Sequence, residues 1–228
     1  MQAELTTDIA DKKEALLQHA LELFAEHGFD GTSVRMIADK AGMNVAMISY
    51  YFGSKEKMFE EMVVLKTAHM RETLDSLLNN TEMDAWEKFQ VLIDNYVDKL
   101  VSSKAHFHRI MMRELSLQKR ETISKIIEER LMYNMKAVRQ LMTEGVKEKV
   151  FRKDIDFGFI MGSLIGTITH TCSYTSLVER FKKAEGNNVK VTPESTKKWL
   201  KENIREMLGG YMLEPAHHAK ALKKKKQK

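Results

Sequence analysis

Two short apolar-patterned segments near the N-terminus predict two small helices separated by a tight turn. In the first segment, apolar residues recur at intervals of three and four, at Val34, Ile37, Ala38 and Ala41. Thr32 or Ser33 precedes this stripe and can accept a backbone N–H at the start of the helix. Gly42 follows it directly, where a helix end commonly requires a left-handed residue. The second segment covers residues 45–52, and we expect Met43, Ile48 and Phe52 to hold it against the first.

A supporting helix, a turn containing glycine and a short second helix together predict a helix-turn-helix unit. The second helix would then lie in the major groove of DNA as a recognition helix. Its less buried residues form the candidate reading surface: Val45, Ala46, Met47, Ser49, Tyr50 and Tyr51. Adjacent tyrosines beside small residues suit close approach to a groove and hydroxyl contacts to phosphate. The alternative is a plain three-helix domain with exposed tyrosines.

The periodicity beyond Ser54 predicts a succession of helices, so the expected fold class is all-α. Helices are expected over residues 54–78, 84–101, 105–117, 121–146, 156–181 and from about 193 to 213. The chain contains only two prolines and little β-branched alternation, which argues against strands. Residues 157–178 carry no Asp, Glu, Lys or Arg and are long enough to test as a membrane span. Their many Gly, Ser and Thr residues instead favour a helix buried between protein surfaces.

Residues Ala15 to Phe59 resemble the N-terminal signature of the tetracycline-repressor (TetR) family of bacterial regulators. The correspondence runs without gaps through Leu16, Leu17, Ala20, Leu23, Phe24, Gly28-Phe29, Thr32-Ser33, Ile37-Ala38, Ala41-Gly42, Ile48, Tyr51-Phe52 and Ser54-Lys55-Glu56. The resemblance implies a homodimer that binds a double-stranded DNA operator. It also implies a DNA-binding head over residues 8–53 and a helical ligand-sensing and dimerisation body over residues 54–213. Residues 214–228 remain as a basic tail that we expect to be disordered.

The resemblance also implies roles for individual residues. It places Thr32, Ser33 and Arg35 near backbone phosphates, Asn44 to Tyr51 on the reading surface, and Lys55 on a phosphate as a point charge. Two positions depart from the family pattern, because Ala46 stands where the family usually has Gly and Ser49 where it has Tyr. These departures leave DNA binding expected and the operator sequence unpredicted.

A ridge of glycines at intervals of four lies on the uncharged helix, at Gly158, Gly162 and Gly166. Such a ridge lets two helix backbones approach closely. The last two long helices form the dimer interface in the family, so the ridge is a candidate for that interface. Packing against a neighbouring helix of the same subunit is an equal alternative.

The chain contains sixteen methionines, several of them clustered between residues 111 and 161. Flexible methionine side chains suit a cavity for a small hydrophobic ligand, although each one also serves as ordinary core filling. The candidate pocket residues are Phe107, Met111, Tyr133 and His170. A single cysteine, Cys172, excludes an intrachain disulfide, and no nucleophile, phosphate loop or metal-spaced Cys/His set is present. We therefore expect neither an enzyme nor a bound cofactor or metal.

Net charge adds little to the case for DNA. The formal charge of +5 falls to −1 without the six lysines of residues 220–228, and residues 1–60 hold six Lys/Arg against ten Asp/Glu. The lysine-rich tail is a solvated end or a source of nonspecific affinity for phosphates, and an anionic membrane surface is less favoured. Two functions remain: a ligand-responsive repressor, and an architectural DNA-binding dimer without an effector. Both would act in the bacterial cytoplasm on the nucleoid, without a membrane.

Overall fold

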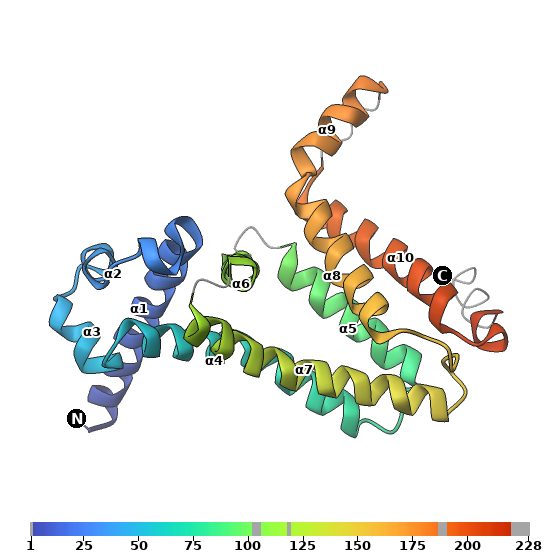
Figure 1. Ribbon diagram of the computed structural model, residues 1–228, viewed down its shortest axis with the longest axis horizontal. Coiled ribbons are helices and arrows are strands. Elements are labelled where there is room, and N and C mark those ends of the chain that lie inside the picture. The colour runs from blue at the N-terminus through green and yellow to red at the C-terminus, as the bar shows by residue number, and fades with distance from the viewer. Residues whose placement is uncertain (1, 102–105, 118–119, 187–190, 220–228) are drawn as a thin grey trace. The chain divides into compact units, whose positions relative to one another are not determined.

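The computed structural model describes residues 2–101, 106–117, 120–186 and 191–219, and all regular elements in these ranges are helices (Figure 1). They are α1 (Gln2–Gly31), α2 (Val34–Ala41), α3 (Val45–Phe52), α4 (Lys55–Asn79), α5 (Ala85–Leu100), α6 (His106–Leu117), α7 (Glu121–Lys147), α8 (Phe157–Ser173), α9 (Thr175–Ala184) and α10 (Pro193–Met212). The expected all-α class is confirmed. Residues 215–219, at the start of the tail expected to be disordered, are helical, and the rest of the tail, residues 220–228, lies outside the described residues.

The helices form two compact units. The first comprises Met1–Arg71 and His106–Tyr133, and the second comprises Glu72–Ala105 and Asn134–Lys228. Helices α4 and α7 therefore contribute one part to each unit. The first unit holds the predicted head together with α6 and the beginning of α7, which is a larger body than residues 8–53.

Aromatic rings from α1 and α4 form the centre of the first unit. Phe24, Phe29 and Phe59 are fully buried, and their ring centroids lie 5.3–5.6 Å from one another. Helix α2 adds Ile37 and α3 adds Ile48 to the same core. The short helices of the helix-turn-helix are thus held by packing on α1 and α4, since eight residues alone would not form a stable helix in water.

The second unit is built around α5, α8 and α10. Trp86 and Phe89 of α5 stack at 6.2 Å, and Phe89 meets the ring of Phe151 at the same distance. Two ion pairs join α5 to α10: Asp94 accepts from Arg205 at 2.5 Å and Asp98 from Lys201 at 2.8 Å.

The expectation of one helix over residues 156–181 is wrong, because the structure breaks it at Tyr174. There α8 ends and the shorter α9 begins, with Tyr174 at φ −108° and ψ 13°. Hydroxyl side chains around the break donate to carbonyls four residues earlier, Ser173 to Thr169 and Thr175 to Thr171. Such bonds compete with the helical backbone and bend or end a helix. None of the described helices combines the length and the apolar character needed to cross a membrane.

Candidate nucleic-acid interface

Local capping sets the limits of the helix-turn-helix. The Ser33 hydroxyl accepts the Met36 N–H at 3.1 Å, so Ser33 is the N-cap of α2. Gly42 ends α2 in the left-handed region at φ 64°, which a residue with a Cβ rarely adopts. Two residues later the Asn44 side chain accepts the Ala46 N–H at 2.9 Å and caps α3. The turn is therefore encoded by residues 42–44 themselves.

Helix α3 buries one side and exposes the other. Ile48 and Phe52 are buried against the core of the first unit, as expected from the sequence. The predicted reading residues divide into an exposed group, Asn44, Val45, Ala46, Ser49 and Tyr50, and a half-buried pair, Met47 and Tyr51. Tyr50 is the most prominent, with 74% of its surface exposed. Its ring contacts that of Tyr51 at 5.2 Å, which orients both rings.

Of the three phosphate contacts predicted at α2, the structure contradicts the contact from the Thr32 side chain. Its side chain is completely buried, and its hydroxyl donates to the Gly28 carbonyl at 2.8 Å. The Thr32 hydroxyl thus binds a carbonyl at the end of α1 and is not available to a phosphate of DNA. Ser33 and Arg35 are exposed, and Arg35 lies only 4.0 Å from Asp39 in a solvated ion pair of little strength. Their phosphate contacts stay predictions.

Lys55, the first residue of α4, already has partners within the protein. Its ammonium donates to the carbonyls of Phe29 and Thr32, both at 2.8 Å, and lies 4.3 Å from the centre of the Phe29 ring. Partial burial lowers the pKa of Lys55, and the positive charge of Arg120 lowers it further. Two of its three N–H donors are used. The third remains for the predicted phosphate.

The carbonyls that Lys55 binds belong to the end of α1, residues 28–32, which we call the 28–32 turn. Gly28 has φ 77° and ψ 175°, a conformation that is essentially restricted to glycine. The Phe29 N–H donates to the Glu114 carboxylate at 3.2 Å. The guanidinium of Arg120 binds the Asp30 carboxylate and lies 5.5 Å from the Phe29 ring. Side chains from α4, α6 and the start of α7 therefore fix the turn that leads into α2.

Sequence reasoning missed Glu114 and Arg120. A signal for Glu114 was present, because this carboxylate lies on the same face of α6 as Phe107, Ile110 and Met111 and is only 9% exposed. A charge in an apolar stripe is rarely buried without a partner. That partner, however, is a backbone N–H 85 residues away, which no local pattern reveals.

Ion pairs within the first unit engage some of the few basic residues of the head. Lys40 binds Glu22 at 2.9 Å, which lowers the pKa of that carboxyl, and Lys13 binds Glu61 at 2.6 Å. Arg35 and Lys57 remain exposed. The positive charge that the head can offer to DNA phosphates is therefore limited to a few exposed residues.

The four candidate pocket residues belong to both units, with Phe107, Met111 and Tyr133 in the first and His170 in the second. Met111 is buried in the core of the first unit, and Phe107 packs against that core. Tyr133 is exposed beneath the Arg71 guanidinium at 4.0 Å. His170, in the second unit, is exposed and stacks on Tyr174 at 4.4 Å. Their roles in binding a ligand stay predictions.

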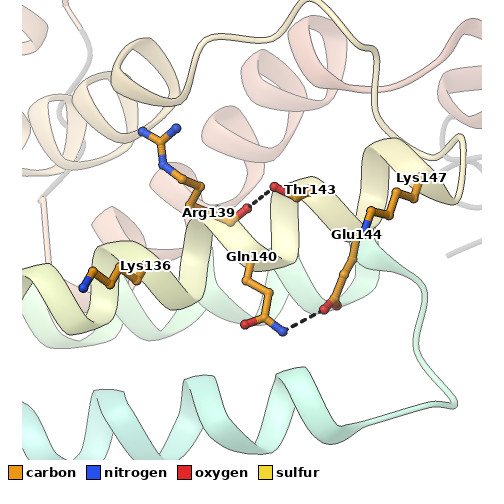
Figure 2. A pocket seen from close by; sticks show the side chains of 6 residues that line it. All are labelled: Lys136, Arg139, Gln140, Thr143, Glu144 and Lys147. Carbon is orange, nitrogen blue, oxygen red and sulfur yellow. Dashed lines mark hydrogen bonds between the residues drawn. The ribbon is translucent and has the colours of Figure 1, made fainter.

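Two grooves on the described part of the chain are each lined by residues of α7 alone. Figure 2 shows the first, formed by Lys136, Arg139, Gln140, Thr143, Glu144 and Lys147. Its polar groups bond to one another, with Gln140 donating to Glu144 and Thr143 to the Arg139 carbonyl, both at 2.9 Å. The second comprises Glu121, Thr122, Lys125, Ile126 and Glu129. A groove along a single helix is a surface feature, and neither groove contains a predicted pocket residue.

All three ridge glycines of α8 are exposed. A Cβ built at Gly162 or Gly166 would meet no neighbouring atom within 4 Å, and at Gly158 it would meet only the Asp156 carboxylate. Within the described part of the second unit, the ridge is therefore not used for packing against a neighbouring helix. Exposed Phe159 and, on α10, exposed Trp199 and Met207 are large apolar neighbours in the same unit. The role of the ridge in a dimer interface stays a prediction.

A buried supporting helix, a glycine turn and a capped second helix with one open face define a helix-turn-helix DNA-binding regulator. Comparison with known proteins supports this class. Residues 16–62 match the family model described as bacterial regulatory proteins, tetR family. The chain is similar to the "Probable HTH-type transcriptional regulator YttP" of Bacillus subtilis, with 30% identity over 145 residues, or 61% of this chain and 67% of YttP. The protein belongs to the TetR family of transcriptional regulators, and the expectation of a non-enzymatic protein is confirmed.

Other relatives cover more of the body. The HTH-type transcriptional repressor KstR2 of Rhodococcus jostii is 28% identical over 168 residues, covering 68% of this chain and 74% of that protein. The structure of the ketosteroid transcriptional regulator KstR2 of Mycobacterium tuberculosis has a TM-score of 0.64 at 21% identity, covering 89% and 95% of the two chains. The regulator FadR of Bacillus subtilis, crystallised with stearoyl-CoA, has a TM-score of 0.60 at 19% identity, covering 84% and 96%. These two structures establish a shared fold.

Proposed function

We propose that this regulator is a repressor, which binds a palindromic operator as a homodimer and is released by a small hydrophobic effector. It would act in the bacterial cytoplasm, on DNA of the nucleoid. The DNA-binding part of this proposal rests on the exposed face of α3. Asn44 caps this helix, and Tyr50 is the most prominent side chain on its exposed face. A helix held in this way presents side chains to base edges while α2 lies near the backbone.

Tyr50→Ala is expected to lower operator affinity roughly tenfold or more, because an exposed reading residue contributes to DNA contacts and not to the core. Its 74% exposure predicts an unchanged melting temperature. The measurement is titration against an operator selected from a random library and against an unselected duplex. Phe181→Ala, which removes another exposed ring outside the first unit, serves as the control. Unchanged operator affinity in Tyr50→Ala would remove α3 from the interface.

Substitutions at Ala46 and Met47 are expected to alter sequence preference. Repeating the selection with Ala46→Gly, which restores the residue usual in the family, tests whether the Ala46 methyl group selects a base. An identical preferred sequence would place Ala46 outside the base contacts.

Dimerisation is proposed through the open face of α8 and its neighbour α10. A helix-turn-helix regulator needs two heads to reach two half-sites about one helical turn apart. The exposed glycines Gly158, Gly162 and Gly166 leave room for a second backbone. Exposed Trp199 and Met207 supply apolar surface of the kind found in the core of such interfaces.

Gly162→Leu is expected to dissociate the dimer while the protomer stays folded. The side chain would enter open space in the protomer, since nothing lies within 4 Å of a Cβ there, but it would obstruct a partner helix. Sedimentation velocity and circular dichroism measure the two properties separately. Thr143→Leu, on the exposed side of α7, is the matched control. A Gly162→Leu variant that remains dimeric would exclude the ridge from the interface.

The effector is proposed to be hydrophobic for two reasons. The chain is rich in methionine, and its structural neighbours include a ketosteroid transcriptional regulator and a regulator crystallised with stearoyl-CoA. An effector would act through α4, whose Lys55 binds the 28–32 turn and whose Met58 and Met62 are fully buried. The half-sites are fixed by DNA geometry, so a small displacement of each head is enough to lose one of them.

The alternative is an architectural DNA-binding dimer without an effector. Linkage distinguishes the two functions, because an effector that weakens DNA binding must bind the DNA complex less tightly by the same factor. The affinity of an amphiphilic ligand is therefore measured with and without operator. Equal affinities would reject the repressor mechanism.

A further inference from the structure

Helix α3 and its N-cap carry no charged side chain. Residues 44–52 contain no Lys, Arg, Asp or Glu, and their polar side chains are one amide, at Asn44, and the hydroxyls of Ser49, Tyr50 and Tyr51. A hydroxyl can rotate to donate or to accept a hydrogen bond, so it distinguishes base pairs weakly. A carboxamide has a donor end and an acceptor end that differ. Asn44 is therefore the side chain of this segment that is best suited to select a base.

The orientation of the Asn44 amide is fixed by the helix that it caps. Its Oδ1 accepts the Ala46 N–H at 2.9 Å, and its backbone is extended, at φ −72° and ψ 138°, as an N-cap requires. The oxygen is thus turned toward the backbone of α3. The residue is exposed, and within the described part of the chain the N–H groups of Nδ2 have no acceptor. Asn44 consequently presents donors to a ligand outside the helix.

The position of Asn44 at the start of α3 suits contact with base edges. The N-terminal residues of a recognition helix are the ones that contact bases in the major groove. Val45 and Ala46, the next two residues, are exposed, and their short side chains leave room for a base beside the amide. The donors of Nδ2 are therefore placed where base readout takes place.

Two donors on one nitrogen do not suit the four bases equally. In the major groove guanine presents two acceptors, N7 and O6, whereas adenine presents N7 beside the N6 donor and thymine presents O4 alone. Asparagine commonly binds adenine through its nitrogen and its oxygen together. In this protein that mode would take Oδ1 from the Ala46 N–H and leave α3 uncapped. Guanine is the base that matches a donor-only amide, as it matches the ammonium of a lysine.

We propose that Asn44 selects a guanine in each half-site of the operator by donating the N–H groups of Nδ2 to N7 and O6. This inference rests on the proposed binding of a palindromic operator, and it adds the base that one residue selects. Oδ1 remains on the Ala46 N–H in the complex, so recognition of the base leaves the cap of α3 intact.

The test exchanges donors for acceptors at this position. Operators are selected from a random library with full-length wild-type protein and with Asn44→Asp, and base preferences are compared position by position. Aspartate caps a helix as well as asparagine does, but its outer oxygen accepts hydrogen bonds. The preferred base should therefore change from guanine to cytosine, whose N4 donates, at one position of each half-site and at no other.

Asn80→Asp is the matched control, because it makes the same chemical change in the turn after α4. There the Asn80 side chain accepts the Glu82 N–H at 2.8 Å and the Met83 N–H at 3.0 Å. This variant should keep every base preference of the wild type. Melting temperatures establish that both variants are folded.

Modified bases in the selected operator identify the atoms that Asn44 binds. Replacing the guanine by adenine should weaken wild-type binding about tenfold. Replacing it by 7-deazaguanine, which lacks N7, should weaken binding severalfold. Inosine lacks only the amino group in the minor groove and should bind as guanine does. Asn44→Ser keeps a capping hydroxyl and removes the amide, so it should bind the guanine and 7-deazaguanine operators about equally.

Two outcomes would overturn the proposal while the proposed function stands. One is a base other than guanine at the position that changes in Asn44→Asp, and the other is a set of preferences that Asn44→Asp leaves unaltered, which would place Asn44 at a phosphate. Tyr50→Ala is measured in the same assay, so its loss of operator affinity would still support α3 as the interface. A wild-type protein that selects no sequence from the library would reject both proposals together.

Discussion

Lys55→Met is expected to lower stability by at least about 2 kcal/mol and to weaken binding to all DNA sequences alike, because two hydrogen bonds from a charged donor are lost together. Both acceptors, the carbonyls of Phe29 and Thr32, belong to buried residues that water cannot easily reach in their place. Methionine keeps the length of the side chain, so the change removes the charge and the donors and not the packing. Thermal unfolding and titration against specific and random duplexes measure the two effects.

The salt dependence of binding separates the two roles of Lys55. A lost phosphate contact reduces the slope of log affinity against log salt by about 0.9 per contact. A Lys55 that only positions the 28–32 turn would weaken binding without changing the slope. Lys66→Met is the matched control, since Lys66 is an exposed lysine further along the same helix. Unchanged melting in Lys55→Met would contradict the importance of the carbonyl bonds.

Gly145→Ala is expected to destabilise the second unit by about 3 kcal/mol or more, at the upper end of the range for overpacked cores. A Cβ at Gly145 would overlap the ring of Phe151 and lie 2.8 Å from the Cβ of Ala85. Phe151 is fully buried and in contact with the ring of Phe89, so it has no free space to move into. Denaturant unfolding measures the loss.

A second substitution makes this prediction specific. Phe151→Leu should cost stability by itself and yet recover part of the loss when combined with Gly145→Ala, because the smaller side chain makes room for the methyl group. Thr143→Ala, at an exposed position of the same helix, is expected to change stability little. Strictly additive losses in the double variant would mean that the steric conflict lies elsewhere.

Features encoded by a few neighbouring residues could be predicted from the sequence. Ser33 and Gly42 define α2 because capping and a left-handed end depend on local chemistry, and the capped α3 buries Ile48 as its spacing predicts. Helix boundaries in the body also lie close to their expected positions, because apolar periodicity is strong there. The break at Tyr174 was missed because an uncharged, apolar run resembles one continuous helix.

Features that depend on distant residues could not be predicted in this way. A threonine before a helix suggests a cap or a phosphate contact, but packing and a bond to Gly28 bury Thr32 completely. The sequence predicts Lys55 as a ligand for phosphate alone, since it does not show that two carbonyls of the 28–32 turn lie within reach of its ammonium. Met111, a candidate pocket residue, is buried in the core of the first unit, because a methionine fits a core as well as a cavity.

The 28–32 turn has a consequence for how this protein can be divided. A fragment ending at residue 53 would contain both short helices and the whole reading surface. It would lack the ammonium of Lys55, the ring of Phe59 and the carboxylate of Glu114, all of which contact the turn. Such a fragment is expected to be poorly folded, and a chimera that joins this head to another regulator's body at that point should fail for the same reason. A transferable DNA-binding module must also include the first part of α4, α6 and the start of α7, which means that this recognition unit is discontinuous along the gene.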